Sequence, residues 1–248
     1  MRILNIVPII SDIWTKETDE YVSKYLLPDT EIVTRKLSYG PASIESEYDE
    51  MLASPEVVFM CRQAQTEGFD AVFVNCFGEP GVRAARECVD IPVFGGFEPA
   101  VNYALGISEK VGIVTVLPEV VSMIEGLIAV KGLKERIKSL RYVNIPVLDL
   151  GDISDLIKAL IAESKMAIIE DGVGVIVLGC TAMVDVTDSV EKGLKAEGYD
   201  IKVIEAAQAA LIMLETYVRM GWRQSRLTYM SPPNKQRVWP SGTNITEI

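Results

Sequence analysis

The feature that most constrains the fold is a strand-like pattern that occurs twice and ends each time in a cysteine. Residues 68–78 (GFDAVFVNCFG) align without gaps on residues 172–182 (GVGVIVLGCTA), and each cysteine lies eight positions after the first glycine. An apolar run that enters a turn is typical of a buried strand whose carboxyl end faces a crevice. Two such strands, ending in Cys76 and Cys180, indicate a duplicated fold with one site between its halves.

Strand-like and helix-like segments follow the same order in both halves of the chain. Apolar or β-branched runs predict strands at residues 2–8, 31–36, 68–76 and 91–94, then at 110–116, 141–145, 172–180 and 201–204. Helices are predicted at residues 18–27, 45–67 (one or two helices, broken near Pro55), 82–88, 119–131, 153–171, 184–197 and 206–220. This alternation is typical of an α/β fold with two four-stranded parallel sheets, each covered by helices on both faces.

The composition excludes several kinds of site and partner. The 248 residues include no histidine, so neither a Ser-His-Asp nor a Cys-His catalytic group is possible. The four cysteines form no CxxC pair, and the usual partners of a zinc site are missing, so no metal is expected. A formal net charge of −11 argues against nucleic acid and anionic membranes as partners.

The ends of the chain and its hydropathy bear on location. No apolar run approaches the roughly 18–20 residues that a membrane-spanning helix needs, and the N-terminus enters a strand without a signal-peptide pattern. These features predict a cytoplasmic protein with reduced thiols that acts on a small molecule. The polar segment 225–248 is expected to pack loosely or to reach a neighbouring molecule.

The two strand-end thiols suggest proton transfer at carbon. In open parallel sheets, ligands bind beyond the carboxyl ends of the strands, and a thiol beside free backbone amides and a helix start is expected to ionise readily. One thiolate can remove a proton from one face of a carbon acid while the opposite thiol delivers a proton to the other face, with no cofactor. Backbone amides near Phe77, Gly78, Thr181 and Ala182 are candidates to stabilise the enolate oxygen.

Other interpretations stay open at this point. Buried cysteines are often no more than small apolar side chains, which is the favoured interpretation of Cys61 and Cys88. Residues 95–98 (GGFE) form either an anion cradle or a plain turn. Glu98 and Glu205 either support the site or cap helices, and Thr115, at the end of a strand, either faces the predicted crevice or is an ordinary strand residue.

These motifs resemble the Asp/Glu/hydantoin racemase superfamily, most closely its hydantoin racemase branch, which includes allantoin racemase. The matching segments are residues 75–81 (NCFGEPG), 178–183 (LGCTAM) and 40–45 (GPASIE). The resemblance implies two pseudo-symmetric α/β lobes, made of residues 1–97 plus about 207–248 and of residues 98–206, with the active site at their interface. It implies a cofactor-independent racemase, with Cys76 and Cys180 as the acid/base pair. It also implies substrate contacts from Asn75, Phe77, Gly78, Thr181 and Ala182, then Ser43 and Thr115, and a homo-oligomer.

The chain departs from this family at two places. Residues 7–12 (VPIISD) stand where the branch usually has an Asn-Pro-Asn-Thr-like element, so a polar contact is expected to move to Ser11. Ala182 follows Gly-Cys-Thr where amino-acid racemases often have histidine, which disfavours aspartate and glutamate as substrates. A 5-substituted hydantoin or related cyclic ureide is therefore the expected substrate. A maleate-type isomerase, an amino-acid racemase and a non-catalytic binder are the alternatives.

Overall fold

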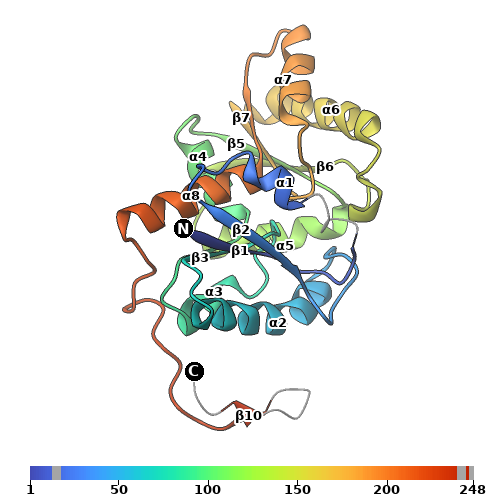
Figure 1. Cartoon of the computed structure of the whole chain (residues 1–248). Coiled ribbons are helices and arrows are strands. Elements are labelled where there is room, and N and C mark those ends of the chain that lie inside the picture. The colour runs from blue at the N-terminus through green and yellow to red at the C-terminus, as the bar shows by residue number, and fades with distance from the viewer. Residues whose placement is uncertain (13–17, 239–243, 246–248) are drawn as a thin grey trace.

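Each half of the chain forms a four-stranded parallel sheet in the computed structural model, which describes residues 1–12, 18–238 and 244–245 (Figure 1). The first sheet has the order β2-β1-β3-β4 and consists of β1 (Arg2–Val7), β2 (Glu31–Lys36), β3 (Ala71–Val74) and β4 (Val93–Phe94). The second has the order β6-β5-β7-β8 and consists of β5 (Val111–Thr115), β6 (Ile137–Tyr142), β7 (Val175–Leu178) and β8 (Lys202–Ile204). The matching orders confirm the predicted duplicated α/β fold.

Helices cover both sheets. The helical segments are α1 (Thr18–Ser23), α2 (Glu47–Thr66), α3 (Val82–Cys88), α4 (Phe97–Leu105), α5 (Pro118–Val130), the 3-10 turn η1 (Val147–Asp149), α6 (Ile153–Asp171), α7 (Thr187–Ala196) and α8 (Ala206–Met220). Local signals set the bounds of α6, because Asp152 caps its first turn and Gly172 ends it at a φ of 66°. Within the described residues, no helix has the length and apolarity needed to span a membrane.

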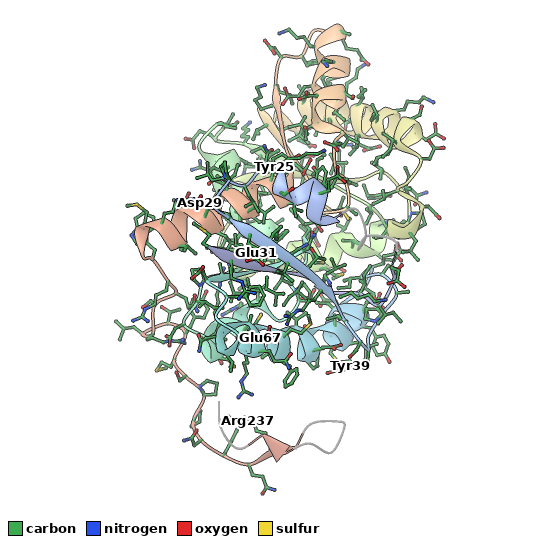
Figure 2. All side chains as sticks on the ribbon, in the orientation of Figure 1. Tyr25, Asp29, Glu31, Tyr39, Glu67 and Arg237 are labelled. Atoms are coloured by element: carbon green, nitrogen blue, oxygen red, sulfur yellow. The ribbon has the colours of Figure 1, made fainter. Side chains whose placement is uncertain are left out.

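The central strands are apolar because both faces of each sheet are covered. Every side chain of β3, β5 and β7 is buried, and β1 is buried from Ile3 onward. Side chains fill the space between sheets and helices (Figure 2). An ion pair between Asp29, which precedes β2, and Arg219 (2.6 Å) ties the first sheet to α8. Burial on both faces explains why the strands lack the alternation of a half-exposed sheet.

Helices α4 and α8 join the halves by crossing between them. Phe97 and Val101 of α4 belong to the core of the second sheet, whereas Ala210 and Leu214 of α8 belong to the core of the first. The two helices contact each other (Figure 1). Separating the sheets would therefore expose apolar surface on both. The division into residues 1–97 plus 207–248 and residues 98–206 stays a prediction.

The predicted break near Pro55 is wrong, because α2 runs through this residue. A proline inside a helix costs about 3 kcal/mol. Ser54 Oγ donates a hydrogen bond to the carbonyl of Glu50 (2.7 Å), and Val57 and Cys61 are fully buried beyond the proline. Full burial of a Val-sized side chain contributes roughly 1.5–3 kcal/mol, so the packing of the residues beyond Pro55 outweighs the lost backbone bond.

Two further predictions differ from the structure. The strand predicted at residues 141–145 is β6, Ile137–Tyr142, which lies at the edge of the sheet. Because β6 has exposed as well as buried positions, its sequence contains no continuous apolar run. The segment predicted to pack loosely is anchored at its start. Arg226 contacts the carbonyl of Arg86 (3.0 Å) and forms an ion pair with Asp90 (2.8 Å). Further along, β9 (Arg237–Val238) and β10 (Asn244–Ile245) form an antiparallel pair, and residues 239–243 and 246–248 lie outside the described residues.

Candidate active site

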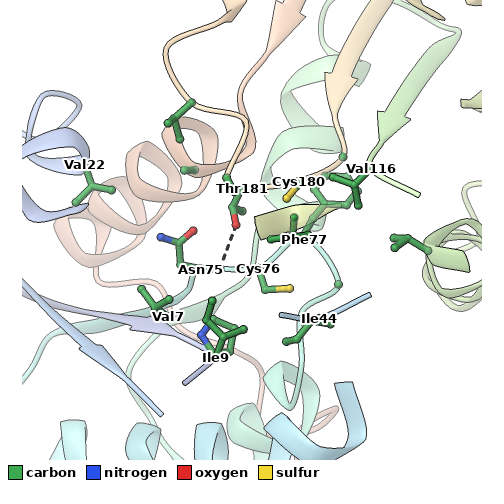
Figure 3. A pocket seen from close by; sticks show the side chains of 18 of the residues that line it. Val7, Ile9, Val22, Ile44, Asn75, Cys76, Phe77, Val116, Cys180 and Thr181 are labelled. Carbon is green, nitrogen blue, oxygen red and sulfur yellow. Dashed lines mark hydrogen bonds between the residues drawn. The ribbon is translucent and has the colours of Figure 1, made fainter. Parts of the chain in front are cut away.

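Cys76 and Cys180 lie two residues beyond the last residues of β3 and β7, and both line one cavity of about 460 Å³ (Figure 3). The strands position them identically. The amide of Asn75 donates to the carbonyl of Ile6 and the amide of Gly179 donates to the carbonyl of Val114, each at 2.8 Å. The residue just before each cysteine is therefore hydrogen-bonded to the neighbouring strand, β1 in the first sheet and β5 in the second. The thiols thus occupy equivalent places in the two lobes.

The turns that follow the thiols are also alike. The amide three positions after each cysteine donates to that cysteine's carbonyl, at 3.4 Å in the first lobe and 3.2 Å in the second. The amides two and three positions after each cysteine also donate toward its sulfur. These are Gly78 and Glu79 for Cys76, and Ala182 and Met183 for Cys180. Each sulfur therefore has two backbone donors ready to stabilise a thiolate.

Burial dominates the ionisation of both thiols. It raises the pKa of Cys180 to about 11, and the nearby Glu45 carboxylate raises this pKa too. It raises the pKa of Cys76 still further, with added contributions from Cys180 and Glu50. The backbone donors lower both pKa values without reversing the effect. The expectation that the thiols ionise readily is therefore wrong for the free protein, in which both are protonated at neutral pH.

Direct contacts between the lobes hold the thiols across one cavity. The hydroxyl of Thr181 donates to the carbonyl of Asn75 (3.1 Å), which joins the residues beside the two cysteines (Figure 3). Gly96 passes so close that a Cβ atom built on it would lie 2.8 Å from Cγ2 of Thr181. Any side chain at position 96 would push the Thr181 turn outward, so this glycine sets how closely the lobes approach.

Tyr21, Lys24 and Asp185 of the cavity lining belong to a polar network in which only Glu205 was a candidate from the sequence. Tyr21 of α1 donates a short hydrogen bond to the carboxylate of Glu205 and is bonded to the hydroxyl of Tyr25 (2.7 Å). The amide of Asp185 donates to the other oxygen of Glu205 (3.3 Å), and Lys24 pairs with the Asp185 carboxylate (2.9 Å). Burial raises the pKa of Glu205 to about 7. No local signal links α1 to residues 185 and 205, because the contact forms only in the folded chain.

Most predicted site residues reach the cavity. The residues that line it include Asn75, Phe77, Gly78, Thr181 and Ala182. Thr115 is fully buried, and its hydroxyl donates to the carbonyl of Gly179 (3.0 Å), so it supports the Cys180 turn from behind. Ser43 and Ser11 do not belong to the lining, and the Ser43 hydroxyl donates to Glu45 (3.2 Å). The structure therefore brings five of the eight predicted contacts to the cavity and leaves three outside its lining.

The remaining predicted groups have structural partners. Glu98 forms ion pairs with Arg86 (2.8 Å) and Lys131 (2.7 Å), and Glu79 accepts a hydrogen bond from the amide of Glu98 (2.8 Å). The segment 95–98 is thus a strand-to-helix turn filled by protein side chains. Across the described part of the chain, no three His, Cys, Asp or Glu residues are grouped as a metal site would require.

Comparison with known proteins gives consistent matches over nearly the whole chain. A family model described as Asp/Glu/Hydantoin racemase matches residues 3–214. The hydantoin racemase of Pseudomonas sp. (strain NS671) is 37% identical over 240 residues, which cover 96% of this chain and 94% of that protein. The allantoin racemase of Klebsiella pneumoniae superposes with a TM-score of 0.88 at 30% identity, covering 98% of both chains. The allantoin racemase of Pseudomonas fluorescens gives 0.86 at 28% identity, covering 96% of this chain and all of that one.

Proposed function

The chain belongs to the Asp/Glu/hydantoin racemase family, and from that premise we propose that it inverts the stereocentre of a 5-substituted hydantoin or a related cyclic ureide such as allantoin. Cys76 and Cys180 are the two proton-transfer groups, and no cofactor takes part. The observation that carries the proposal is the placement of both thiols in equivalent turns on one cavity. An enzyme that inverts a carbon centre needs a base on one face and an acid on the other.

The chemistry follows from this placement. The C5–H bond of a hydantoin lies between a carbonyl and a nitrogen. One cysteine, as thiolate, takes the C5 proton and becomes a thiol, and the electron pair of the C–H bond moves into a planar enolate. The opposite thiol then gives its proton to the other face of C5 and becomes a thiolate. Charge and protons balance, and the enzyme ends with the thiolate on the other lobe.

The pKa values bear on this cycle in two ways. Burial destabilises the thiolate and makes it a stronger base, while the backbone donors bring its pKa back toward the range in which a catalytic base is most effective. The backbone amides of Gly78 and Ala182 supply the donors that make the ionised sulfur attainable at all.

The cavity disfavours dicarboxylate substrates. Among its described lining residues the single cationic side chain is Lys24, and Asp185 already pairs with it at 2.9 Å. A dicarboxylate such as maleate or aspartate would bring two carboxylates into a cavity whose described lining has no unpaired positive charge, which is unfavourable. The alternatives of a maleate-type isomerase and an amino-acid racemase are therefore weaker than the hydantoin proposal. A non-catalytic binder remains the outcome if no substrate turns over.

Hydrogen exchange at C5 tests the proposal. Single enantiomers of several 5-substituted hydantoins and allantoin are incubated with the protein in D2O, and the C5–H signal is followed by proton NMR alongside optical rotation. Cys76→Ser and Cys180→Ser are each expected to lower racemisation at least about 10³-fold. Each variant keeps a single base, so it exchanges one enantiomer faster than the other. Cys88→Ser, which changes a thiol outside the cavity, is the matched control.

The outcomes separate the candidate functions. Loss of the C5–H signal together with optical rotation supports racemisation. Absence of exchange above the uncatalysed rate for every cyclic substrate would overturn the proposal, and addition of a thiol to maleate, seen by intact mass, would favour the isomerase. The proposal also includes a cytosolic location and a homo-oligomeric state. Light scattering on a sizing column tests the oligomeric state.

A further inference from the structure

Glu50, in the first turn of α2, is a partly exposed carboxylate close to Cys76, and the cycle described above does not use it. Its Oε2 atom lies 3.4 Å, and the sulfur of Cys76 3.8 Å, from the point where a Gly78 side chain would begin. The carboxylate and the thiol therefore face the same space beside this glycine. Glu50 is not among the described residues that line the cavity, so a bound substrate does not occupy its place.

Glu50 differs from Glu45, the carboxylate near Cys180, in its bonding. Glu45 accepts hydrogen bonds from the amide of Val147 (2.7 Å) and from the Ser43 hydroxyl (3.2 Å). Among the described residues, no cation or hydrogen-bond donor pairs with the Glu50 carboxylate. Removing a carboxylate from water without a partner costs free energy, so the position of Glu50 does not stabilise the fold.

The surroundings of Glu50 suit the uptake and release of a proton. Burial raises the pKa of Glu50 to about 7, and the carboxylates of Glu47, on the same helix, and of Glu79, in the turn after the thiol, raise it too. The acid and its conjugate base are therefore both populated near neutral pH, which is the condition that favours a proton carrier. The charge of Glu50 in turn contributes to the raised pKa of Cys76.

The racemisation cycle leaves a proton to be moved after each inversion. Once the Cys76 thiolate has taken the C5 proton and the Cys180 thiol has given its own, the thiolate is on the wrong lobe for a second molecule of the same enantiomer. Cys76 must then lose a proton and Cys180 must gain one. Because burial raises the pKa of Cys76, this loss is slow without an acceptor close to the sulfur.

We propose that Glu50 is the proton-exchange group of Cys76 and carries protons between this thiol and solvent from one turnover to the next. This inference rests on the proposed racemase function and deepens it. The S–H bond of Cys76 breaks, the electron pair stays on sulfur, and the proton passes to the Glu50 carboxylate, directly or through one water. Glu50 then releases the proton to solvent, while the Cys180 thiolate takes a proton from solvent through the cavity. Charge and protons balance, and the reverse sequence serves the other enantiomer.

Steady-state kinetics separate this role from a structural one. Glu50→Gln keeps the shape of the side chain and is expected to lower kcat about 10- to 100-fold, because the return of the proton then limits the rate at saturating substrate. The ratio kcat/KM should stay within about threefold, because at low substrate the ionised forms of the free protein equilibrate between encounters. Both parameters are measured by polarimetry for each enantiomer of a 5-substituted hydantoin. Glu50→Asp keeps an acid and should retain more of kcat than Glu50→Gln.

A control and a chemical rescue sharpen this test. Glu47→Gln removes an exposed carboxylate from the same helix and should leave both parameters nearly unchanged. Imidazole, added at constant pH and ionic strength, should restore part of the kcat of Glu50→Gln, because a dissolved base can carry the proton instead. Restoration supports proton exchange by Glu50, and a kcat that imidazole does not change contradicts it.

Gly78→Ala tests the space that the two groups share. The new methyl group would lie 3.4 Å from Oε2 of Glu50, 3.7 Å from Cε of Met123 and 3.8 Å from the sulfur of Cys76, which are ordinary contacts. Gly78 does not have a positive φ, so alanine is compatible with the backbone. The variant is expected to lower kcat, and adding Glu50→Gln should lower it little further, since both changes act on one proton route. Independent losses that multiply would contradict a shared route.

The outcomes distinguish this inference from the function on which it rests. Equal losses of kcat and kcat/KM in Glu50→Gln would give the residue a structural role and overturn the inference, and so would an unchanged kcat. In both cases the racemase function would stand. Absence of racemisation by the unaltered protein would overturn both.

Discussion

In each lobe a carboxylate joins the turn after the cysteine to the segment that follows the last strand of the sheet. The two lobes differ in which end of this contact supplies the carboxylate. Phe94 pairs with Phe73 and Ile204 pairs with Val177, so Gly95 and Glu205 occupy the same place after the last strand of each sheet. In the second lobe, the Glu205 carboxylate reaches back to the turn after Cys180 and accepts from the amide of Asp185.

In the first lobe, the carboxylate comes from the turn itself. Glu79 follows Cys76 by three residues and accepts a hydrogen bond from the amide of Glu98 at the start of α4 (2.8 Å). Its side chain fills the space that a residue larger than Gly95 would need, because a Cβ there would lie 2.5 Å from Cγ of Glu79. The comparison shows that the lobes share the positions of the thiols but differ in the residues that support them.

The difference extends to ionisation. Near Glu79 lie the cationic side chains of Arg86 and Lys131, whereas Glu205 bonds directly to the neutral hydroxyl of Tyr21. Burial raises the pKa of both carboxyls, to about 7 for Glu205. Glu205, which supports the Cys180 turn, therefore changes its charge near neutral pH.

The largest expected effect is the pH dependence of stability caused by Glu205. Its pKa rises from 4.5 to about 7 on folding, so the folded state binds more protons between these values. The wild type should therefore lose up to about 3 kcal/mol of unfolding free energy, relative to Glu205→Gln, as pH rises from 4.5 to 7. Urea denaturation across this range measures it, with the exposed Glu125→Gln as control. A difference that does not change with pH would contradict a buried Glu205 carboxyl.

The next effect concerns the close approach of the lobes. Gly96→Ala should lower kcat/KM about 100-fold, because the added carbon displaces Thr181 beside Cys180 and small misplacements of catalytic groups are costly. This corresponds to about 2.7 kcal/mol. Ala206 occupies the equivalent place in the second lobe. Ala206→Gly should keep most of the activity, and equal losses in both variants would show that the lobes do not differ here.

A smaller effect tests the packing of Glu79 over Gly95. Gly95→Ala should destabilise the protein by about 2 kcal/mol, because the new methyl group overlaps the Glu79 side chain. The same substitution in a Glu79→Gly background should cost less, since the overlaps with Cγ (2.5 Å) and Cβ (2.9 Å) of Glu79 are removed and only the 3.1 Å approach to its Cα remains. Thermal or urea denaturation of the four proteins in this double-mutant cycle gives the coupling. Strictly additive effects would rule out the contact.

The smallest effect is the difference in thiol reactivity. Burial raises the pKa of both thiols, so iodoacetamide should alkylate Cys180 in Cys76→Ser and Cys76 in Cys180→Ser more slowly than an exposed thiol, and Cys76 the more slowly of the two. Peptide mapping separates labelling of Cys180 or Cys76 from labelling of Cys88. Equal rates at the two sites would indicate that the thiols ionise alike.

Much of the fold and part of the site follow from sequence. The predicted bounds of the helices at residues 153–171 and 206–220 match α6 and α8. Local signals suffice there, because Gly172 and Gly221 end both helices in the left-handed conformation. The paired cysteines were likewise visible as a repeat. Continuity of α2 through Pro55 was not predictable, because tertiary burial outweighs a local rule.

What the sequence by itself determined is the order of the elements and the matched places of Cys76 and Cys180, since apolar runs and turn residues act over a few neighbouring positions. The tertiary structure alone decided the raised pKa values of the thiols, the buried place of Thr115 and the meeting of Tyr21 with Asp185 at the cavity. Each of these depends on side chains and backbone from different elements meeting at one point. Desolvation and packing are properties of that meeting and not of any single segment.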